Sequence, residues 1–185
     1  ISVEKVWNDA NNQDGIRPTS ISVSLLADGT AVSGKTVTLN STNSWKYIFT
    51  DLPVYSNGTK IIYTVEETSI PTGYSAETTG DETTGFTITN THTPETTQVS
   101  VEKVWNDSND QDGLRPDSIS VSLLANGIAV DGKTVALDES NSWKHTFTDL
   151  PVYSSGTKIT YTVSETGVPN EYTSKTTGDE TTGFT

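Results

Sequence analysis

The chain has 185 residues and carries 24 acidic against 11 basic side chains, which gives a net charge of −13. Such an acidic surface gains nothing from meeting a phosphate backbone or an anionic bilayer, so neither nucleic acid nor membrane is expected as a partner. The absence of cysteine excludes disulfides, thiolate nucleophiles and cysteine-ligated metals.

The sequence is an internal repeat. A shift of 98 positions aligns residues 1–87 with residues 99–185 without a gap, and 63 of the 87 aligned positions are identical. Each copy is long enough to bury a core of its own. We therefore predict two copies of one domain.

Strand signals follow one another along each copy. Apolar and polar residues alternate in short runs, turn residues such as Asp28-Gly29 separate the runs, and no stretch shows helical periodicity. In the first copy the predicted strands cover residues 1–7, 20–27, 31–39 with an interruption at Gly34, 43–50, 59–67, 74–79 and 84–91. About seven strands are typical of an immunoglobulin-like sandwich. The expected fold is all-β, with one sandwich at residues 1–91, a short Thr/Pro linker at 92–98, and a second sandwich at 99–185 whose last strand is incomplete.

Aromatic residues supply much of the predicted core. Trp45, Tyr47 and Phe49 share one face of their strand, and Trp7 is in phase with the apolar residues of the first strand. These positions predict burial. The alternative is an exposed tryptophan platform for carbohydrate, which would make the chain a ligand-binding module.

Three polar residues fall on the core side of their strands. Lys5 is in phase with Val3 and Trp7, Glu67 with Tyr63 and Val65, and Asn90 with Phe86 and Ile88. Burial lowers the pKa of a lysine and raises that of a glutamate, because it disfavours both charged forms. A neutral amine beside the amide carbon of Asn90 would permit amide exchange. A plain Lys5–Glu67 ion pair, hydrogen-bonded to Asn90, is the alternative.

Several motifs give the chain a resemblance to the B-type repeat domains of Gram-positive collagen adhesins, the CnaB family. The resemblance runs through both copies and rests on Val3-Glu4-Lys5-Val6-Trp7-Asn8-Asp9, Asp14-Gly15-Ile16-Arg17-Pro18, Trp45-Lys46-Tyr47, Asp51-Leu52-Pro53, Tyr63-Thr64-Val65-Glu66-Glu67 and Ile88-Thr89-Asn90. It implies stalk or spacer repeats in a cell-wall-anchored adhesin or pilin at the bacterial surface. The alternative is that the repeats themselves bind a ligand, either a host protein or a glycan. The implied partners are neighbouring repeats of the same protein, and the fragment is expected to be a monomer.

The resemblance also implies a chemistry for the inward-facing polar residues. Lys5 would be the nucleophile, Asn90 the amide that loses ammonia, and Glu67 the catalytic acid and proton shuttle, hydrogen-bonded to the Asn90 carbonyl. The product would be a spontaneous intramolecular isopeptide bond. The reaction would occur once per molecule, so the chain is not expected to be a turnover enzyme.

The second copy differs at one implied position. Lys103 and Glu165 match Lys5 and Glu67, whereas Asn90 shifted by 98 falls at position 188, beyond Thr185. Lys103 is therefore predicted to be an unpaired crosslinking lysine in this chain. A peptide with the sequence of the last strand could then link to Lys103 in trans.

No cofactor or metal is expected. The loop with Asp9, Asn11 and Asp14 is rich in oxygen atoms, yet it lacks the calcium-loop spacing and its terminal glutamate, so a solvated turn is favoured. His92 and His145 have no matching partners in the sequence and suggest neither metal nor triad chemistry. No apolar run approaches the roughly 20 residues of a membrane span and no signal peptide is visible, so the chain is expected to be a piece of a longer protein.

Overall fold

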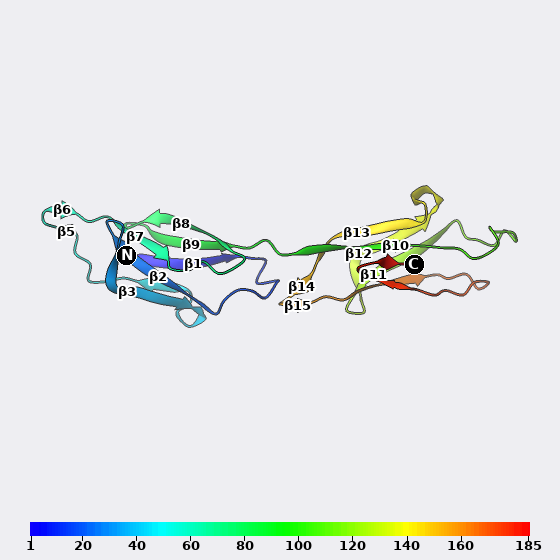
Figure 1. Ribbon diagram of the computed structural model, residues 1–185, viewed down its shortest axis with the longest axis horizontal. Coiled ribbons are helices and arrows are strands. Elements are labelled where there is room, and N and C mark those ends of the chain that lie inside the picture. The colour runs from blue at the N-terminus through cyan, green and yellow to red at the C-terminus, as the bar shows by residue number, and fades with distance from the viewer. The chain divides into compact units, whose positions relative to one another are not determined.

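The computed structural model describes all 185 residues and divides into two compact units, Ile1–Pro94 and Glu95–Thr185. The regular secondary structure of each unit is β-strand apart from one short 3₁₀ turn, at Ser41–Asn43 and at Glu139–Asn141 (Figure 1). Both turns are closed by a capping box in which Asn40 or Asp138 accepts from the backbone of the turn. None of the helical turns has the length and apolar character that crossing a membrane requires.

The first unit has nine strands. They are β1 (Ser2–Asn8), β2 (Ser20–Ala27), β3 (Thr30–Asn40), β4 (Lys46–Ile48), β5 (Tyr55–Ser56), β6 (Thr59–Lys60), β7 (Tyr63–Glu67), β8 (Ser75–Asp81) and β9 (Gly85–Thr91). Seven of them form two sheets, of order β4-β1-β9-β8 and β3-β2-β7, while β5 and β6 form a separate hairpin. The prediction of an all-β sandwich with about seven strands is confirmed.

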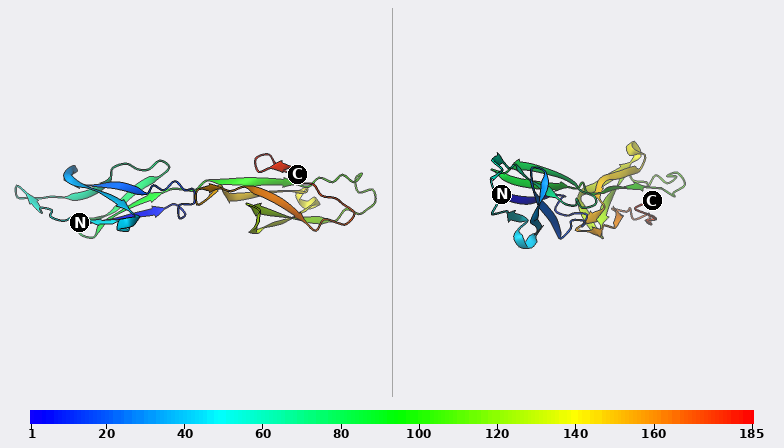
Figure 2. Two further views of the ribbon diagram at one scale, coloured as in Figure 1. Left: turned by 90° about the horizontal axis from the view of Figure 1, so that it is seen from below. Right: turned by 60° about the vertical axis from the view of Figure 1, so that its left-hand side comes forward.

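The second unit repeats this architecture (Figure 2). Its strands are β10 (Thr96–Glu102), β11 (Ser118–Ala125), β12 (Ile128–Asp138), β13 (Lys144–Pro151), β14 (Tyr153–Ser154), β15 (Thr157–Lys158), β16 (Tyr161–Thr166), β17 (Gly178–Asp179) and β18 (Gly183–Phe184). The sheets have the order β13-β10-β18-β17 and β12-β11-β16, beside the β14–β15 hairpin. Residues 96–98, which the sequence places in the linker, already belong to β10 and pair with β13.

The first and last strands of the first unit lie side by side in the middle of one sheet. β1 and β9 run parallel, with Lys5 opposite Ile88 and Trp7 opposite Asn90. In a strand, alternate residues share a face, so Lys5 and Asn90 point to the same side of this sheet. The chain ends of the unit are therefore joined through one ladder of backbone hydrogen bonds.

The core lies between the two sheets of each unit. In the first unit the fully buried side chains include Val23, Leu25, Leu39 and Ile88, so both sheets contribute to it. The expected burial of Tyr47 is wrong: Tyr47 is 42% exposed, whereas Phe49 is buried. β4 is a short edge strand, so the Tyr47 ring extends past the rim of the core and meets the Phe49 ring edge-on at 5.1 Å.

One predicted strand also differs in its extent. The strand predicted at residues 59–67 is divided into β6 and β7, because Ile62 turns outward and donates its N–H to the side chain of Asp28 at 2.9 Å. The interruption predicted at Gly34 is confirmed in the pairing of β3, although β3 continues through it as one element: the β2–β3 register passes from Ser24–Thr36 to Leu26–Ala31, and Gly34 lies in the bulge between them with a left-handed φ of 76°.

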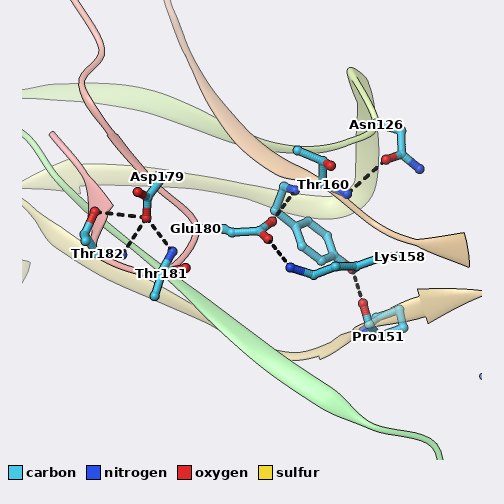
Figure 3. Close-up of polar contacts among 9 residues, drawn as sticks. Asn126, Pro151, Lys158, Thr160, Asp179, Glu180, Thr181 and Thr182 are labelled. Carbon is cyan, nitrogen blue, oxygen red and sulfur yellow. Dashed lines mark hydrogen bonds and ion pairs between the residues drawn. The ribbon is translucent and has the colours of Figure 1, made fainter.

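An acidic pair fixes the turn before the last strand in both units. In the second unit Asp179 accepts hydrogen bonds from the backbone of Thr181 and Thr182, while Glu180 reaches Lys158 at 2.9 Å (Figure 3). Glu180 also accepts from the backbone N–H of Tyr161 at 2.9 Å. Asp81 and Glu82 make the equivalent contacts in the first unit. This turn therefore ties the last hairpin to the strand of the facing sheet.

Replacement of Leu25 by alanine tests the core of the first unit. Leu25 is fully buried, so L25A is expected to lower the free energy of unfolding by about 3 kcal/mol through lost transfer energy and a residual cavity. I48A is the control, since Ile48 is 64% exposed and should change stability by less than about 0.5 kcal/mol. Hydrogen exchange at β2 amides in a urea series measures both. Equal effects of the two variants would contradict this assignment of the core.

Candidate functional site

Lys5, Glu67 and Asn90 come together inside the first unit. Lys5 on β1 and Asn90 on β9 belong to neighbouring strands of one sheet, and Glu67 ends β7 in the facing sheet. All three residues are buried, with relative exposures of 4%, 8% and 0%. The sequence placed each of them on a core face, and the structure brings Glu67 into contact with both Lys5 and Asn90.

The Glu67 carboxylate lies between the other two side chains. Its Oε2 is 3.4 Å from the Lys5 Nζ, and its Oε1 accepts a hydrogen bond from the Asn90 Nδ2 at 3.0 Å. Lys5 Nζ also donates to the Ile88 carbonyl at 3.5 Å. The Asn90 Oδ1 is buried and has no hydrogen-bond partner.

One expected contact is reversed. The sequence-based hypothesis had Glu67 bonded to the Asn90 carbonyl, whereas the structure has the Asn90 amide N–H donating to Glu67. An ionised carboxylate can only accept hydrogen bonds, so the amide turns its nitrogen toward it. In this arrangement the amide oxygen faces away from any donor.

Burial changes the protonation of the lysine. Desolvation lowers the pKa of Lys5 from 10.5 to about 8, and the nearby Glu67 carboxylate only partly opposes this shift. The lower pKa makes the neutral amine more abundant at neutral pH than it is for a free lysine. The site can therefore supply a nucleophilic amine next to an amide.

Aromatic rings enclose the lysine. Lys5 Nζ lies 4.6 Å from the centre of the Trp7 ring, and the Arg17 guanidinium lies 5.6 Å from the same ring. Trp7 meets the rings of Trp45 and Tyr74 edge-on at 5.3 Å and 5.2 Å. Both tryptophans pack against the core, so they are walls of the buried site rather than an exposed carbohydrate platform.

The loop after β1 is held by a buried carboxylate. Asp9 is 2% exposed and accepts hydrogen bonds from the Arg17 Nε and the Tyr74 hydroxyl, each at 2.8 Å. These donors, the Arg17 guanidinium first, lower the pKa of Asp9 to about 2. No group of three or more His, Asp or Glu side chains is placed to hold a metal ion. The oxygen-rich composition of this loop thus serves internal hydrogen bonds.

The expectation that His92 lacks partners is wrong. Its Nε2 lies 2.9 Å from the Asp14 Oδ2, and its Nδ1 lies 2.8 Å from the Gly73 carbonyl oxygen. Asp14, more than the other groups, raises the pKa of His92, since both acceptors favour the doubly protonated ring. These partners are 78 and 19 residues away in the chain, so strand periodicity gave no signal for them.

The corresponding site in the second unit is more open. Lys103 Nζ donates to both oxygens of Glu165 at 2.9 Å, and Ser174 donates to Glu165 at 2.6 Å. The Lys103 side chain is 17% exposed, compared with 0% for the Lys5 side chain. A pocket of about 740 Å³ adjoins this ion pair and is lined by, among others, Trp105, Asp107, Ile119, Val163 and Tyr172.

The fold and the buried polar side chains define an immunoglobulin-like sandwich repeat in which the first and last strands pair with each other. The family profile of the Cna protein B-type domain matches residues 1–91 and again residues 99–185. The chain belongs to this family and consists of two tandem B-type domains.

A sequence relative and a solved structure show the same relationship. The collagen adhesin of Staphylococcus aureus is 46% identical over 177 residues, which are 96% of this chain and 15% of that protein. The crystal structure of two B repeat units of the Staphylococcus aureus collagen binding protein matches with a TM-score of 0.87 and 44% identity, over 99% of this chain and 47% of that one. The present chain thus spans a small part of the length of the adhesin it resembles.

The His92 contact predicts a pH dependence of stability. Because folding raises the pKa of His92 above its ordinary 6.5, the stabilising contribution is fully present below about pH 6.5 and is lost as the pH rises through the folded-state value. H92Q should therefore destabilise the first unit in mild acid and converge with the parent chain in alkali.

Urea unfolding across a pH series measures this difference. H145Q is the control. It makes the same replacement at a histidine whose ring packs against Phe147, with 4.7 Å between the ring centres. A constant gap between H92Q and the parent chain at every pH would contradict the role of the charged imidazole.

Proposed function

We propose that the two repeats serve as a stalk or spacer in a Gram-positive cell-wall-anchored adhesin, and that the first repeat is locked by an isopeptide bond between Lys5 and Asn90. The observation that carries the proposal is the buried contact of Lys5, Glu67 and Asn90 across the two sheets. Membership of the B-type domain family and identity to a collagen adhesin support the stalk role. The repeats would act outside the cell, as a monomeric segment beside neighbouring repeats of the same protein.

The bond would form by amide exchange. Lys5 Nζ first passes its proton to Glu67 Oε2, and the neutral amine then attacks the Asn90 Cγ. The new C–N bond forms while the bond from Cγ to Nδ2 breaks. Glu67 delivers the proton that it received to Nδ2, so that ammonia leaves, and its regenerated carboxylate then takes a proton from the attacking nitrogen.

In this proposal, folding is the main reason why the isopeptide bond forms at a useful rate. The parallel β1–β9 ladder holds amine and amide on one face, which converts a bimolecular reaction into an intramolecular one. Water is kept from the amine by the Trp7 ring and the core. Each molecule reacts once, so no turnover activity is proposed.

The proposed crosslink has a mechanical consequence. It would join the first and last strands of the unit, so a force on the chain ends would load a covalent bond before the hydrogen-bond ladder. Closing a loop of this length would also stabilise the fold by roughly 4–5 kcal/mol, by the chain-entropy estimate for disulfides.

Intact-mass measurement of the unfolded chain tests the bond. The parent chain is expected to lack one ammonia relative to its sequence, and fragmentation should locate the link between Lys5 and Asn90. E67Q should keep the full mass, because an amide cannot shuttle the proton. K5R, which retains the positive charge at this position, is the second control.

A full-mass parent chain would contradict the crosslink and leave the plain ion pair as the description of the site. An ammonia loss that persists in both E67Q and K5R would place the reaction elsewhere in the chain.

The second repeat permits a test in trans. Lys103 contacts Glu165 as the proposed nucleophile would, and the adjoining pocket is open. A peptide with the sequence of residues 87–93 is expected to form a covalent adduct with Lys103, observed as a mass gain of the peptide less one ammonia. The same peptide with Asn90→Ala should bind without linking. Binding of the asparagine peptide, seen as a change in Trp105 fluorescence, without an adduct would contradict the reactivity of Lys103.

A further inference from the structure

Two Asn-Gly pairs occur in the chain, at Asn57-Gly58 and Asn126-Gly127. Glycine lacks a Cβ, so its backbone nitrogen is the least hindered nucleophile that an asparagine side chain can meet. No atom lies within 4 Å of the position that a Cβ would take at either Gly58 or Gly127. Both asparagines are exposed and sit in two-residue hairpin turns with left-handed φ values of 48° and 51°.

The side chain of Asn126 is held in place. Its Oδ1 accepts a hydrogen bond from the Thr160 N–H at 3.0 Å (Figure 3). The backbone N–H of Asn126 donates to the Thr160 carbonyl at 2.8 Å. The hairpin that carries it joins β11 and β12, of eight and eleven residues, and β11 pairs further with β16. Opening this turn would disrupt a three-stranded sheet.

The side chain of Asn57 makes no hydrogen bond, and its hairpin is small. β5 and β6 have two residues each, with only the pairs Tyr55–Lys60 and Ser56–Thr59 between them, and neither strand joins a larger sheet. All four strand residues are exposed. Local opening of such a segment costs little free energy compared with opening a core sheet.

We propose that Asn57 is a site of spontaneous deamidation, while Asn126 is protected by the fold. The Gly58 nitrogen loses its proton and attacks the Asn57 Cγ; the C–N bond forms, the bond to Nδ2 breaks, and ammonia leaves with that proton. Water then opens the resulting succinimide at either carbonyl. The products carry aspartate or isoaspartate in place of Asn57.

The modification changes the hairpin in two ways. Each product adds one negative charge to an exposed turn three residues from Lys60, which pairs with Glu82. Isoaspartate also inserts an extra carbon into the backbone, which a two-residue turn cannot accommodate in its present register. The second unit avoids this chemistry at the same place, because Ser155 occupies the position equivalent to Asn57.

Incubation of the folded chain at mildly alkaline pH, followed by peptide mapping, tests the proposal. Conversion replaces NH by O in the mass, and electron-transfer fragmentation separates isoaspartate from aspartate. In the folded chain Asn57 is expected to convert at least about tenfold faster than Asn126. Only at Asn126 must the side-chain hydrogen bond break and the turn between β11 and β12 open before the reaction. In denaturant the two sites should convert at similar rates, since both are then plain Asn-Gly pairs.

N57S, which copies the second unit, should abolish the fast conversion while leaving the slow conversion at Asn126 unchanged. Equal rates at Asn57 and Asn126 in the folded chain would overturn the proposal. So would an Asn57 that is stable in the folded chain although it converts readily in denaturant.

Discussion

Removing the ammonium group of Lys5 from water is the energetic constraint on which the first unit depends. Burying an ion costs several kcal/mol, and the compensating groups must come from other strands. They are the Glu67 carboxylate, from the facing sheet, and the Ile88 carbonyl, from the last strand. A one-residue slip of β1 or β9 would turn Lys5 or Asn90 to the opposite face, so this contact also selects the register of the parallel pair.

The hydrogen bonds of the buried glutamate differ between the two units. In the first unit Glu67 is hydrogen-bonded to Asn90, and its nearest approach to the lysine is 3.4 Å. In the second unit Glu165 meets Lys103 through both oxygens at 2.9 Å and also accepts from Ser174. In the first unit the Asn90 amide thus occupies one oxygen of the carboxylate, whereas in the second unit the lysine reaches both oxygens.

Sequence periodicity predicted a large share of the fold and of the candidate site. It identified the repeat, the two sandwiches, and the core-facing positions of Lys5, Glu67 and Asn90. It failed for Tyr47, because alternation cannot distinguish the rim of an edge strand from the centre of a sheet. It also missed the contacts of His92 with Asp14 and Gly73, because all three lie at or beyond strand ends where no period applies.

By itself the sequence determined that Lys5, Glu67 and Asn90 face inward, because strand alternation is a local property of the backbone. The family membership follows in the same way from motifs whose order and spacing are visible along the chain. Only the tertiary structure decided that β1 and β9 are parallel neighbours and that Glu67 bridges Lys5 and Asn90 from the opposite sheet. Strand order, the direction of a hydrogen bond and the loss of hydration depend on groups far apart in the chain, which become neighbours only when both sheets have packed.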